Sequence, residues 1–469
     1  MQRKAYLAKN TALFALNSIG IRIITFLLVP IYTNTFGTSE YGEIDLVVTM
    51  VTILSPIIFF NIGEAVMRFS LDENAQKNKI ASIGLVFSLT AVILGTSIFV
   101  VLWFFPQITI NGWIVYFYCI TEGLFHTVSC YLRGQEKILQ YAISNILSTL
   151  FMAILNIVFL LVFKLGINGY FLAYIISYII ASIYCIFAGD VLMVFKRFSI
   201  DKDLMKGMVK YSIVLIPNSL MWWVMNSSDH VMVTAMVGIA ANGIYAISYK
   251  IPSILSALST VFNQAWAFSA IHENKSNDRV AFNNNMYDKL ARFLTIVTIG
   301  LMCIMKPFLK AYVGMTYYEA WMYTPYLLVG NFFLTLATFL STFYTVNKDS
   351  KGFLVSGTIG AAVNIILNYL LIPVIKVHGA AFATCVSYIC VYLYRVYDTR
   401  KYMRIEVFQK QYVLGYTILI LAAISMFINS WIGQVVLIIE LIMVIVLNLS
   451  FVKECLTIIR SIIVKIISK

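Results

Sequence analysis

Long apolar segments alternate with short polar connectors along the whole chain. The segments run to roughly 18 to 25 residues, and about 20 apolar residues are enough for a helix to cross the hydrocarbon core of a bilayer. We therefore predict an all-α, polytopic membrane protein with about fourteen transmembrane helices. The expected spans are residues 10–31, 41–62, 80–104, 112–132, 142–163, 169–195, 211–237, 244–271, 290–312, 322–346, 353–375, 379–397, 411–430 and 432–452.

The distribution of basic residues predicts the orientation of these spans. The chain holds 34 Lys and Arg against 21 Asp and Glu, a net charge of +13. Such an excess can indicate nucleic-acid binding, but in a membrane protein it is typical of cytoplasmic loops. With a cytoplasmic N-terminus, and with basic residues near the end of a span counted with the adjoining side, the inner side holds 28 of the basic residues and the outer side holds four, Lys164, Lys306, Lys310 and Lys376. We expect both termini to be cytoplasmic and no nucleic acid to be bound.

Internal repeats predict how the spans are grouped. Residues 154–164 read ILNIVFLLVFK and residues 366–376 read ILNYLLIPVIK, an offset of 212. Gly169, Ala173, Ser177 and Tyr178 recur as Gly379, Ala383, Ser387 and Tyr388, and GTSEYG at 37–42 resembles GIAANG at 238–243. We predict two six-helix lobes that are parallel repeats, with an N-lobe at 1–200, a C-lobe at 201–402, and two extra helices with an interfacial basic tail at 403–469.

Ionisable residues inside the spans are candidates for function because they are costly to insert into a bilayer. Arg22, Asp45, Asp229 and Lys250 lie roughly 6 to 13 Å below the outer boundary, at about 1.5 Å per helical residue. They come from spans 1, 2, 7 and 8, the leading pairs of the two repeats. We expect them to line a cavity, and the alternative is that they form ion pairs that only hold helices together.

Other residues have a functional and a structural interpretation. Glu122 and His126 are four residues apart on one helix face, so they form either a proton or ion relay or a hydrogen bond between helices. His230 follows Asp229 and has the same two interpretations. Trp222 and Trp223 would stack on sugar rings or pack against neighbouring helices.

Enzyme signatures are absent from the sequence. It contains no GxxxxGK[ST] phosphate-binding loop, no HExxH and no GxSxG, and its four histidines and seven cysteines show no metal-ligand spacing. Hydrophobic residues make up 61% of the chain and charged residues 12%, and the connectors leave no room for a soluble catalytic domain. We therefore expect a secondary transporter, with no enzyme activity, cofactor or bound metal.

The N-terminal sequence resembles that of a known family. Residues 10–50, which include PIYTNTFGTSEYG, and the segment EAVMRFSLDE at 64–73 are similar to the bacterial polysaccharide (O-antigen, Wzx-type) flippases. These belong to the multidrug/oligosaccharidyl-lipid/polysaccharide exporter superfamily. Two six-helix lobes with two further helices are the architecture of that branch, so the resemblance extends over essentially the whole chain.

The resemblance implies a function. Such a protein would move an undecaprenyl-diphosphate-linked oligosaccharide from the inner to the outer leaflet of the bacterial plasma membrane by alternating access. Membrane lipids would surround it, a proton or sodium ion could drive it, and a polysaccharide polymerase and chain-length machinery would be its partners. By this resemblance Arg22, Arg68 and Lys250 would contact the diphosphate, and Asp45 and Asp229 would hold these cations or carry the coupling ion.

Two other classes of protein stay open at this stage. A multidrug or small-molecule cation antiporter of the same superfamily would share the repeats, but it should lack the last two spans and the basic cavity. An integral-membrane enzyme such as a polysaccharide polymerase would normally have a long outer loop, and the longest outer connector here has only about ten residues.

Overall fold

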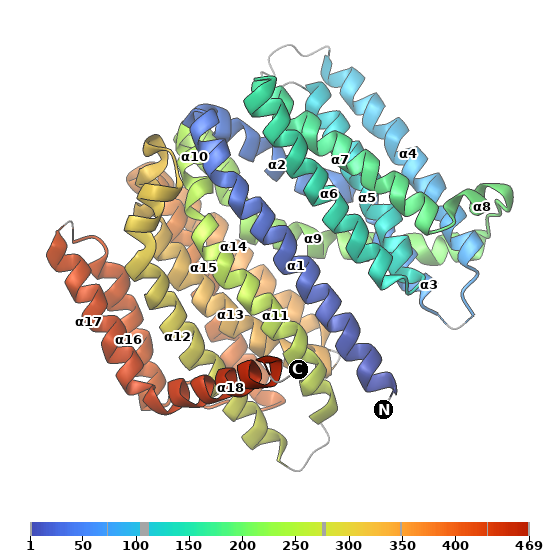
Figure 1. The fold of residues 1–469 in the computed structure, drawn as a ribbon. Helices are drawn as coiled ribbons and strands as arrows, with labels where there is room; N and C mark the ends of the chain where they lie inside the picture. The colour runs from blue at the N-terminus through green and yellow to red at the C-terminus, as the bar shows by residue number, and fades with distance from the viewer. Residues whose placement is uncertain are drawn as a thin grey trace. The chain divides into compact units, whose positions relative to one another are not determined.

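The computed structural model describes residues 2–72, 74–103, 112–273, 278–347, 349–428 and 430–467. All regular secondary structure in these ranges is helical, which confirms the predicted all-α, polytopic class (Figure 1). The chain divides into two compact units, Met1–Gly243 and Ile244–Lys469.

The first unit is built from long helices joined by short turns. They are α1 (Gln2–Thr35), α2 (Thr38–Ile58), α3 (Ile62–Ser70), α4 (Lys77–Trp103), α5 (Gly112–Gly134), α6 (Ile138–Ile157), the π-helical extension η1 (Val158–Val162), α7 (Gly166–Ala188), α8 (Val191–Lys196), α9 (Lys202–Met236) and the start of α10 (Ile239–Ser248). Helix α5 packs on α2, α3, α4, α6 and α7 and is therefore central to this unit. One apolar core joins α3, α4, α8 and α9 around Ile62, Val66, Ile80, Val191 and Met208, all of them at most 3% exposed.

The second unit is organised around a single buried helix. Its elements are α11 (Lys250–Glu273), α12 (Arg279–Tyr312), η2 (Met315–Met322), α13 (Thr324–Val346), α14 (Ser350–Ile375), α15 (Val377–Asp398), η3 (Thr399–Lys401), α16 (Lys410–Ser425), α17 (Trp431–Leu447) and α18 (Leu449–Ile467). Helix α13 contacts α11, α12, α14, α15 and α16. Of its most apolar 18-residue stretch, 83% is buried. The aromatic side chains Phe332, Phe339 and Tyr344 fill this interior.

Equivalent residues of the sequence repeat have equivalent surroundings in the two units. Lys164 and Lys376 end the two ILN segments with positive φ angles of 52° and 51°. A Cβ added at Gly169 would lie 3.1 Å from Phe159, and one added at Gly379 would lie 2.6 Å from Leu371, which is 212 residues after Phe159. The helical hairpins α6–η1–α7 and α14–α15 are therefore built alike, as the repeat predicts.

The lobe boundary expected at 200/201 stays a prediction. Helix α9 follows that position and belongs by its contacts to the first unit, where it packs on α2 and α3. Only the sequence repeat assigns α9 to the second lobe.

Nine helices of the described chain are long and apolar enough to span a membrane. They correspond to nine of the expected spans, and the remaining expected spans are also helical. Helices α5, α9 and α11 contain more polar residues, while α10, α16 and α17 are short, with 10, 16 and 17 residues. Most residues that a membrane protein turns toward lipid are apolar, and the exposed side chains of α14, such as Ile366, Tyr369 and Leu370, follow this rule.

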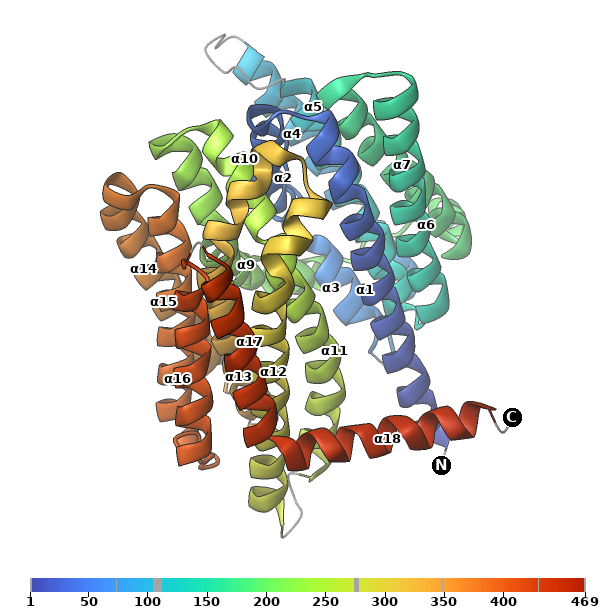
Figure 2. The ribbon, with the colours of Figure 1, turned by 60° about the vertical axis from the view of Figure 1, so that its left-hand side comes forward.

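The last two helices meet at a sharp bend. Helix α17 ends at Leu447, five residues before the expected end of its span at 452, and α18 leaves it at an angle of 75° (Figure 2). The sequence of α18 is largely apolar and is interrupted by charged residues, which include Lys453, Glu454 and Arg460. This bent helix occupies the place of the expected interfacial tail, of which residues 468–469 lie outside the described range.

Candidate functional site

The second expected span is broken between α2 and α3. Pro56 lies in the last turn of α2, and the chain then passes through Phe60 and Asn61, both with φ of 51°. A left-handed conformation is uncommon at residues other than glycine, and it persists where the surrounding structure enforces it. The Asn61 amide donates a hydrogen bond to Ser219 of α9 at 3.5 Å, which holds the break against that helix.

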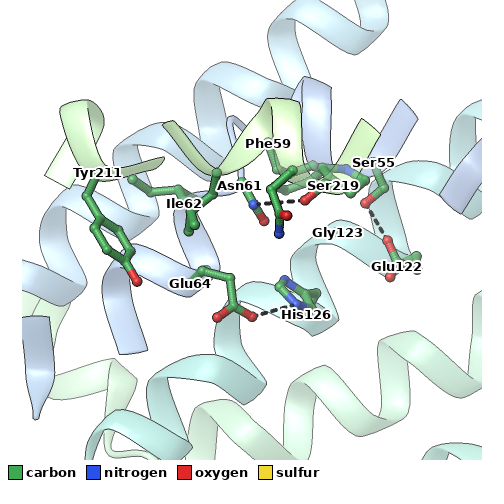
Figure 3. A pocket seen from close by; sticks show the side chains of 14 residues that line it. Ser55, Phe59, Asn61, Ile62, Glu64, Glu122, Gly123, His126, Tyr211 and Ser219 are labelled. Carbon is green, nitrogen blue, oxygen red and sulfur yellow. Dashed lines mark hydrogen bonds and ion pairs between the residues drawn. The ribbon is translucent and has the colours of Figure 1, made fainter. Parts of the chain in front are cut away.

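A cavity of about 390 Å³ opens at this break (Figure 3). Helices α2, α3, α5 and α9 supply its walls. Its polar lining consists of hydroxyl, amide, carboxylate and imidazole groups from Ser55, Asn61, Glu64, Glu122, His126, Tyr211, Asn218 and Ser219.

A second cavity of about 300 Å³ adjoins the first. It lies among α1, α5, α6 and α7, and Glu122 and His126 line both spaces. Further polar groups in its lining come from Thr25, Ser129, Tyr141, Asn145, Ser148, Thr149, Tyr174, Ser177 and Tyr178. Among the described residues, no Lys or Arg lines either cavity, so their charge comes from carboxylates and one imidazole.

Each charged group of the first cavity has a polar or charged partner. Glu64 Oε1 lies 3.8 Å from Nε2 of His126, and Ser55 donates a short hydrogen bond to Glu122 (Figure 3). Glycine at position 63 allows this approach of α3 to α5, because a Cβ there would lie 2.8 Å from Nδ1 of His126. Such an arrangement can bind a proton or another cation, since two carboxylates and a histidine line the same cavity.

Asp45 and Asp229 lie in another polar cluster of the first unit. Asp45 accepts hydrogen bonds from the His230 ring at 2.7 Å and from the Asn242 amide at 3.0 Å. Asp229 is 1% exposed and accepts a bond from the backbone N–H of His230 at 3.1 Å. The structure thus brings together two of the predicted acidic residues with His230, on helices α2 and α9.

The predicted cations come from three different helices. Arg22 is half-buried on α1. Arg68 is exposed on α3 and forms an ion pair with Asp72 at 2.6 Å, one helical turn further along the chain. Lys250 is half-buried at the first residue of α11, in the second unit.

The two predicted tryptophans lie on α9. The Trp223 indole donates a hydrogen bond to the backbone carbonyl of Thr49 at 2.9 Å, which ties α9 to α2. Trp222 is half-buried beside it. The bond of Trp223 fits a packing role, and sugar stacking by either residue stays a prediction.

Several lining residues were not predicted from the sequence. The sequence predicts Glu64 to lie in a cytoplasmic connector, whereas the structure places it in the first turn of α3, where it lines the cavity. Ser55, Asn218 and Ser219 are small polar residues within apolar segments, and nothing in the pattern separates them from other serines and asparagines. Pro56 followed by a Phe-Phe-Asn turn and an acidic residue was the available signal for the break.

Comparisons with known proteins agree with this architecture. The profile of the family described as polysaccharide biosynthesis protein matches residues 7–274, more than half of the chain. No curated protein matches the sequence.

The fold is similar to solved transporter structures. The lipid II flippase MurJ in an inward closed conformation aligns with a TM-score of 0.69 and 14% identity over 96% of this chain and 100% of that chain. An inward-facing multidrug resistance MATE family transporter of the MOP superfamily gives 0.63 and 11%, over 83% and 94%. A MOP superfamily transporter from Pyrococcus furiosus gives 0.56 and 11%, over 84% and 93%. The fold is therefore that of MOP superfamily transporters, and the chain belongs to the polysaccharide biosynthesis protein family.

Proposed function

We propose that this protein is a secondary transporter that moves undecaprenyl-diphosphate-linked oligosaccharide from the inner to the outer leaflet of the bacterial plasma membrane by alternating access. The observation that carries the proposal is the family match over residues 7–274, which includes every residue that lines the two cavities. The similarity in fold to a lipid II flippase supports a lipid-linked cargo. Both termini are expected in the cytoplasm, and a polysaccharide polymerase would consume the product.

Two kinds of charged site would bind different partners, one the diphosphate and the other the coupling cation. A diphosphate is anionic, and guanidinium and ammonium groups are its usual partners in proteins. The two cavities contain carboxylates without Lys or Arg, so they suit a coupling cation such as a proton or sodium ion. We assign Glu122 and His126 to that cation, with Asp45 and Asp229 as a second candidate cluster, and we assign Arg22, Arg68 and Lys250 to the diphosphate.

Polymer export in a strain without its own flippase tests the cargo. We expect Arg22→Ala to abolish surface polymer at a normal level of inserted protein, and Arg22→Lys to restore only part, because bidentate contact is lost. A guanidinium inside a span costs at least about 2.5 kcal/mol unless it has a partner or water.

The competing role of Arg22 predicts a different result. If Arg22 only balances Asp45, Arg22→Ala should lower the amount of inserted protein, and Arg22→Ala with Asp45→Ala should restore both protein and export. Full export by the single Arg22→Ala variant would exclude Arg22 from cargo binding.

Export of organic cations is the second candidate function. The acidic cavities favour it, because Glu122 lies among the aromatic rings of Phe125, Tyr174 and Tyr178 in the second cavity, where a lipophilic cation would be stabilised. Efflux of a cationic dye from cells that express the protein measures this activity. Dye efflux that is lost in Glu122→Gln, together with no rescue of polymer export by the unmodified protein, would replace the flippase proposal.

A further inference from the structure

Three side chains next to the first cavity bring different metal-binding atoms close together. Glu64 Oε1 lies 3.8 Å from His126 Nε2, and the same nitrogen lies 3.7 Å from Sγ of Cys130. One carboxylate oxygen, the imidazole nitrogen and the sulfur all lie within 4.8 Å of one another. His126 and Cys130 are four residues apart on one face of α5, and Glu64 reaches them from the first turn of α3.

These separations are close to those around a tetrahedral zinc ion. With Zn–N and Zn–O bonds of about 2.1 Å and a Zn–S bond of about 2.3 Å, tetrahedral geometry places N and O about 3.4 Å apart and N and S about 3.6 Å apart. The observed 3.8 Å and 3.7 Å differ from these values by a few tenths of an ångström. The remaining separation, between the carboxylate oxygen and the sulfur, is at most 4.8 Å.

The chemistry of the three groups selects the class of ion. Sulfur and imidazole nitrogen favour zinc and similar transition metals, whereas sodium, magnesium and calcium prefer oxygen. With Cys130 as thiolate, Glu64 as carboxylate and His126 neutral, the ligands carry two negative charges, which a divalent cation neutralises. That balance matters because Cys130 is 2% exposed, and an uncompensated charge there would be costly.

The site also has an entrance and a free coordination position. Glu64 and His126 line the 390 Å³ cavity, so an ion and a water molecule can reach them from that space (Figure 3). We propose that Glu64, His126 and Cys130 form a binding site for one thiophilic divalent cation of the zinc class, with three protein ligands and a fourth position open to the cavity. A bound ion links α3 to α5 directly beside the break that separates α2 from α3.

Cobalt binding to the purified full-length protein in detergent tests the proposal, because Co²⁺ takes the place of zinc and reports its ligands. We expect one equivalent of Co²⁺ to produce a thiolate-to-metal charge-transfer band in the near ultraviolet and the strong visible bands of tetrahedral coordination. One equivalent of Zn²⁺ should displace it and remove both signals. Binding of Co²⁺ without the charge-transfer band would overturn the assignment of Cys130 as a ligand.

Substitution of each ligand tests the set. Cys130→Ser should remove the charge-transfer band, and His126→Gln and Glu64→Gln should each weaken Zn²⁺ binding at least tenfold in competition with a chromophoric chelator. Cys119→Ser is the matched control, since Cys119 is another buried cysteine of α5 outside the cluster, and it should leave binding unchanged. Equal Zn²⁺ affinity in Cys130→Ser and the unmodified protein would refute the site.

A measurement without any substitution covers the case in which a variant fails to fold. X-ray absorption at the zinc edge of the unmodified protein with one equivalent of Zn²⁺ should show one sulfur at about 2.3 Å and nitrogen or oxygen ligands at about 2.0–2.2 Å. A first shell of oxygen and nitrogen alone would show that zinc binds elsewhere. Neither experiment depends on the transported cargo, so each can fail while the proposed cargo stands, and a zinc ion bound at His126 would leave Glu122 of that pair to take the coupling cation.

Discussion

The indole of Trp223 can serve the protein through its N–H group or through its aromatic face. The structure shows the N–H bonded to the Thr49 carbonyl at 2.9 Å, in a place where α9 meets α2. Trp223→Phe keeps an aromatic ring and removes the donor. We expect it to lower the unfolding free energy by about 1 kcal/mol, the usual net value of such a bond, while export per inserted protein is retained.

Thermal unfolding in detergent and polymer export measure the two roles of Trp223 separately. Trp431→Phe is the control, since Trp431 is 77% exposed on α17 and should change neither quantity. An unchanged melting temperature with lost export in Trp223→Phe would favour contact with the sugar.

Asp349 gives the second unit a titrating contact outside the membrane spans. It accepts hydrogen bonds from the backbone N–H of Gly352 at 2.9 Å and the Tyr402 hydroxyl at 2.8 Å, and Lys401 lies 3.1 Å away. These contacts, that of Gly352 first, lower the pKa of Asp349 from 3.8 to about 2. A carboxyl with a lowered pKa in the folded state stabilises the protein above its unfolded pKa, and this contribution is lost as the pH falls from about 4 to about 2.

We therefore expect Asp349→Asn to lower the melting temperature at pH 7, and the difference from the unmodified protein to shrink between pH 4 and pH 2. Melting curves in detergent across this range make the comparison. A difference that stays constant down to pH 2 would mean that the ionised form of Asp349 is not the stabilising one.

At the level of residues, the sequence predicted the charged groups better than their partners. Glu122 and His126 were identified because two ionisable groups four residues apart stand out in an apolar span, and both line the cavities. Glu64 was missed because it follows an apolar segment and was counted as part of a connector. The pairing of Asp45 with His230 and Asn242 joins residues about 200 positions apart, and no local pattern predicts such a contact.

At the level of elements, the two repeated hairpins are expected to differ in their tolerance of added volume. A Cβ at Gly379 would lie 2.6 to 2.8 Å from backbone atoms of Leu371 and Ile372, which cannot move independently of the helix. A Cβ at Gly169 would meet the Cβ atoms of Leu165 at 2.8 Å and Phe159 at 3.1 Å, so its closest contacts are slightly longer than those at Gly379. We expect Gly379→Ala to cost about 1–3 kcal/mol through overpacking, and Gly169→Ala to cost less.

Melting temperatures of the two glycine variants check this order. Gly357→Ala is the control on α14, where an added Cβ would meet no atom within 4 Å, so alanine should be neutral or stabilising by up to about 1 kcal/mol. Equal losses in Gly169→Ala and Gly379→Ala would show that the two hairpins are packed more alike than these distances indicate.

The elements themselves follow from hydropathy, but their interruptions do not. The ILN segments and the glycines that follow them, Gly169 and Gly379, predicted two similar hairpins, because small residues that recur at corresponding positions favour similar close packing. The break at Phe60 and Asn61 lies within a run of apolar and small residues that reads as one continuous span. A positive φ at such residues depends on tertiary contacts, as with Asn61 and Ser219, which the local sequence does not reveal.

At the level of the whole molecule, the membrane orientation is the property that the sequence predicts most directly. The basic residues divide 28 to four between the two sides of the predicted register, and this bias sets orientation during insertion. The structure adds that the turn before α2 and the turn before α10 lie at the same end of the first unit. A Cβ at Gly42 would lie 1.9 Å from the Ile239 carbonyl oxygen, and one at Gly243 would lie 2.0 Å from the Thr38 carbonyl oxygen.

Because these two helix starts are in contact, the loops that precede them must share one side of the membrane. We expect reporter fusions after Lys202 and after Lys401 to be cytoplasmic, and fusions at Gly37 and at Gly238 both to be external. Paired alkaline-phosphatase and fluorescent-protein fusions at each position measure this, since the first is active only outside and the second only inside. A cytoplasmic signal from both glycine positions would invert the orientation while keeping the contact, whereas opposite signals from the two would contradict the parallel repeat itself.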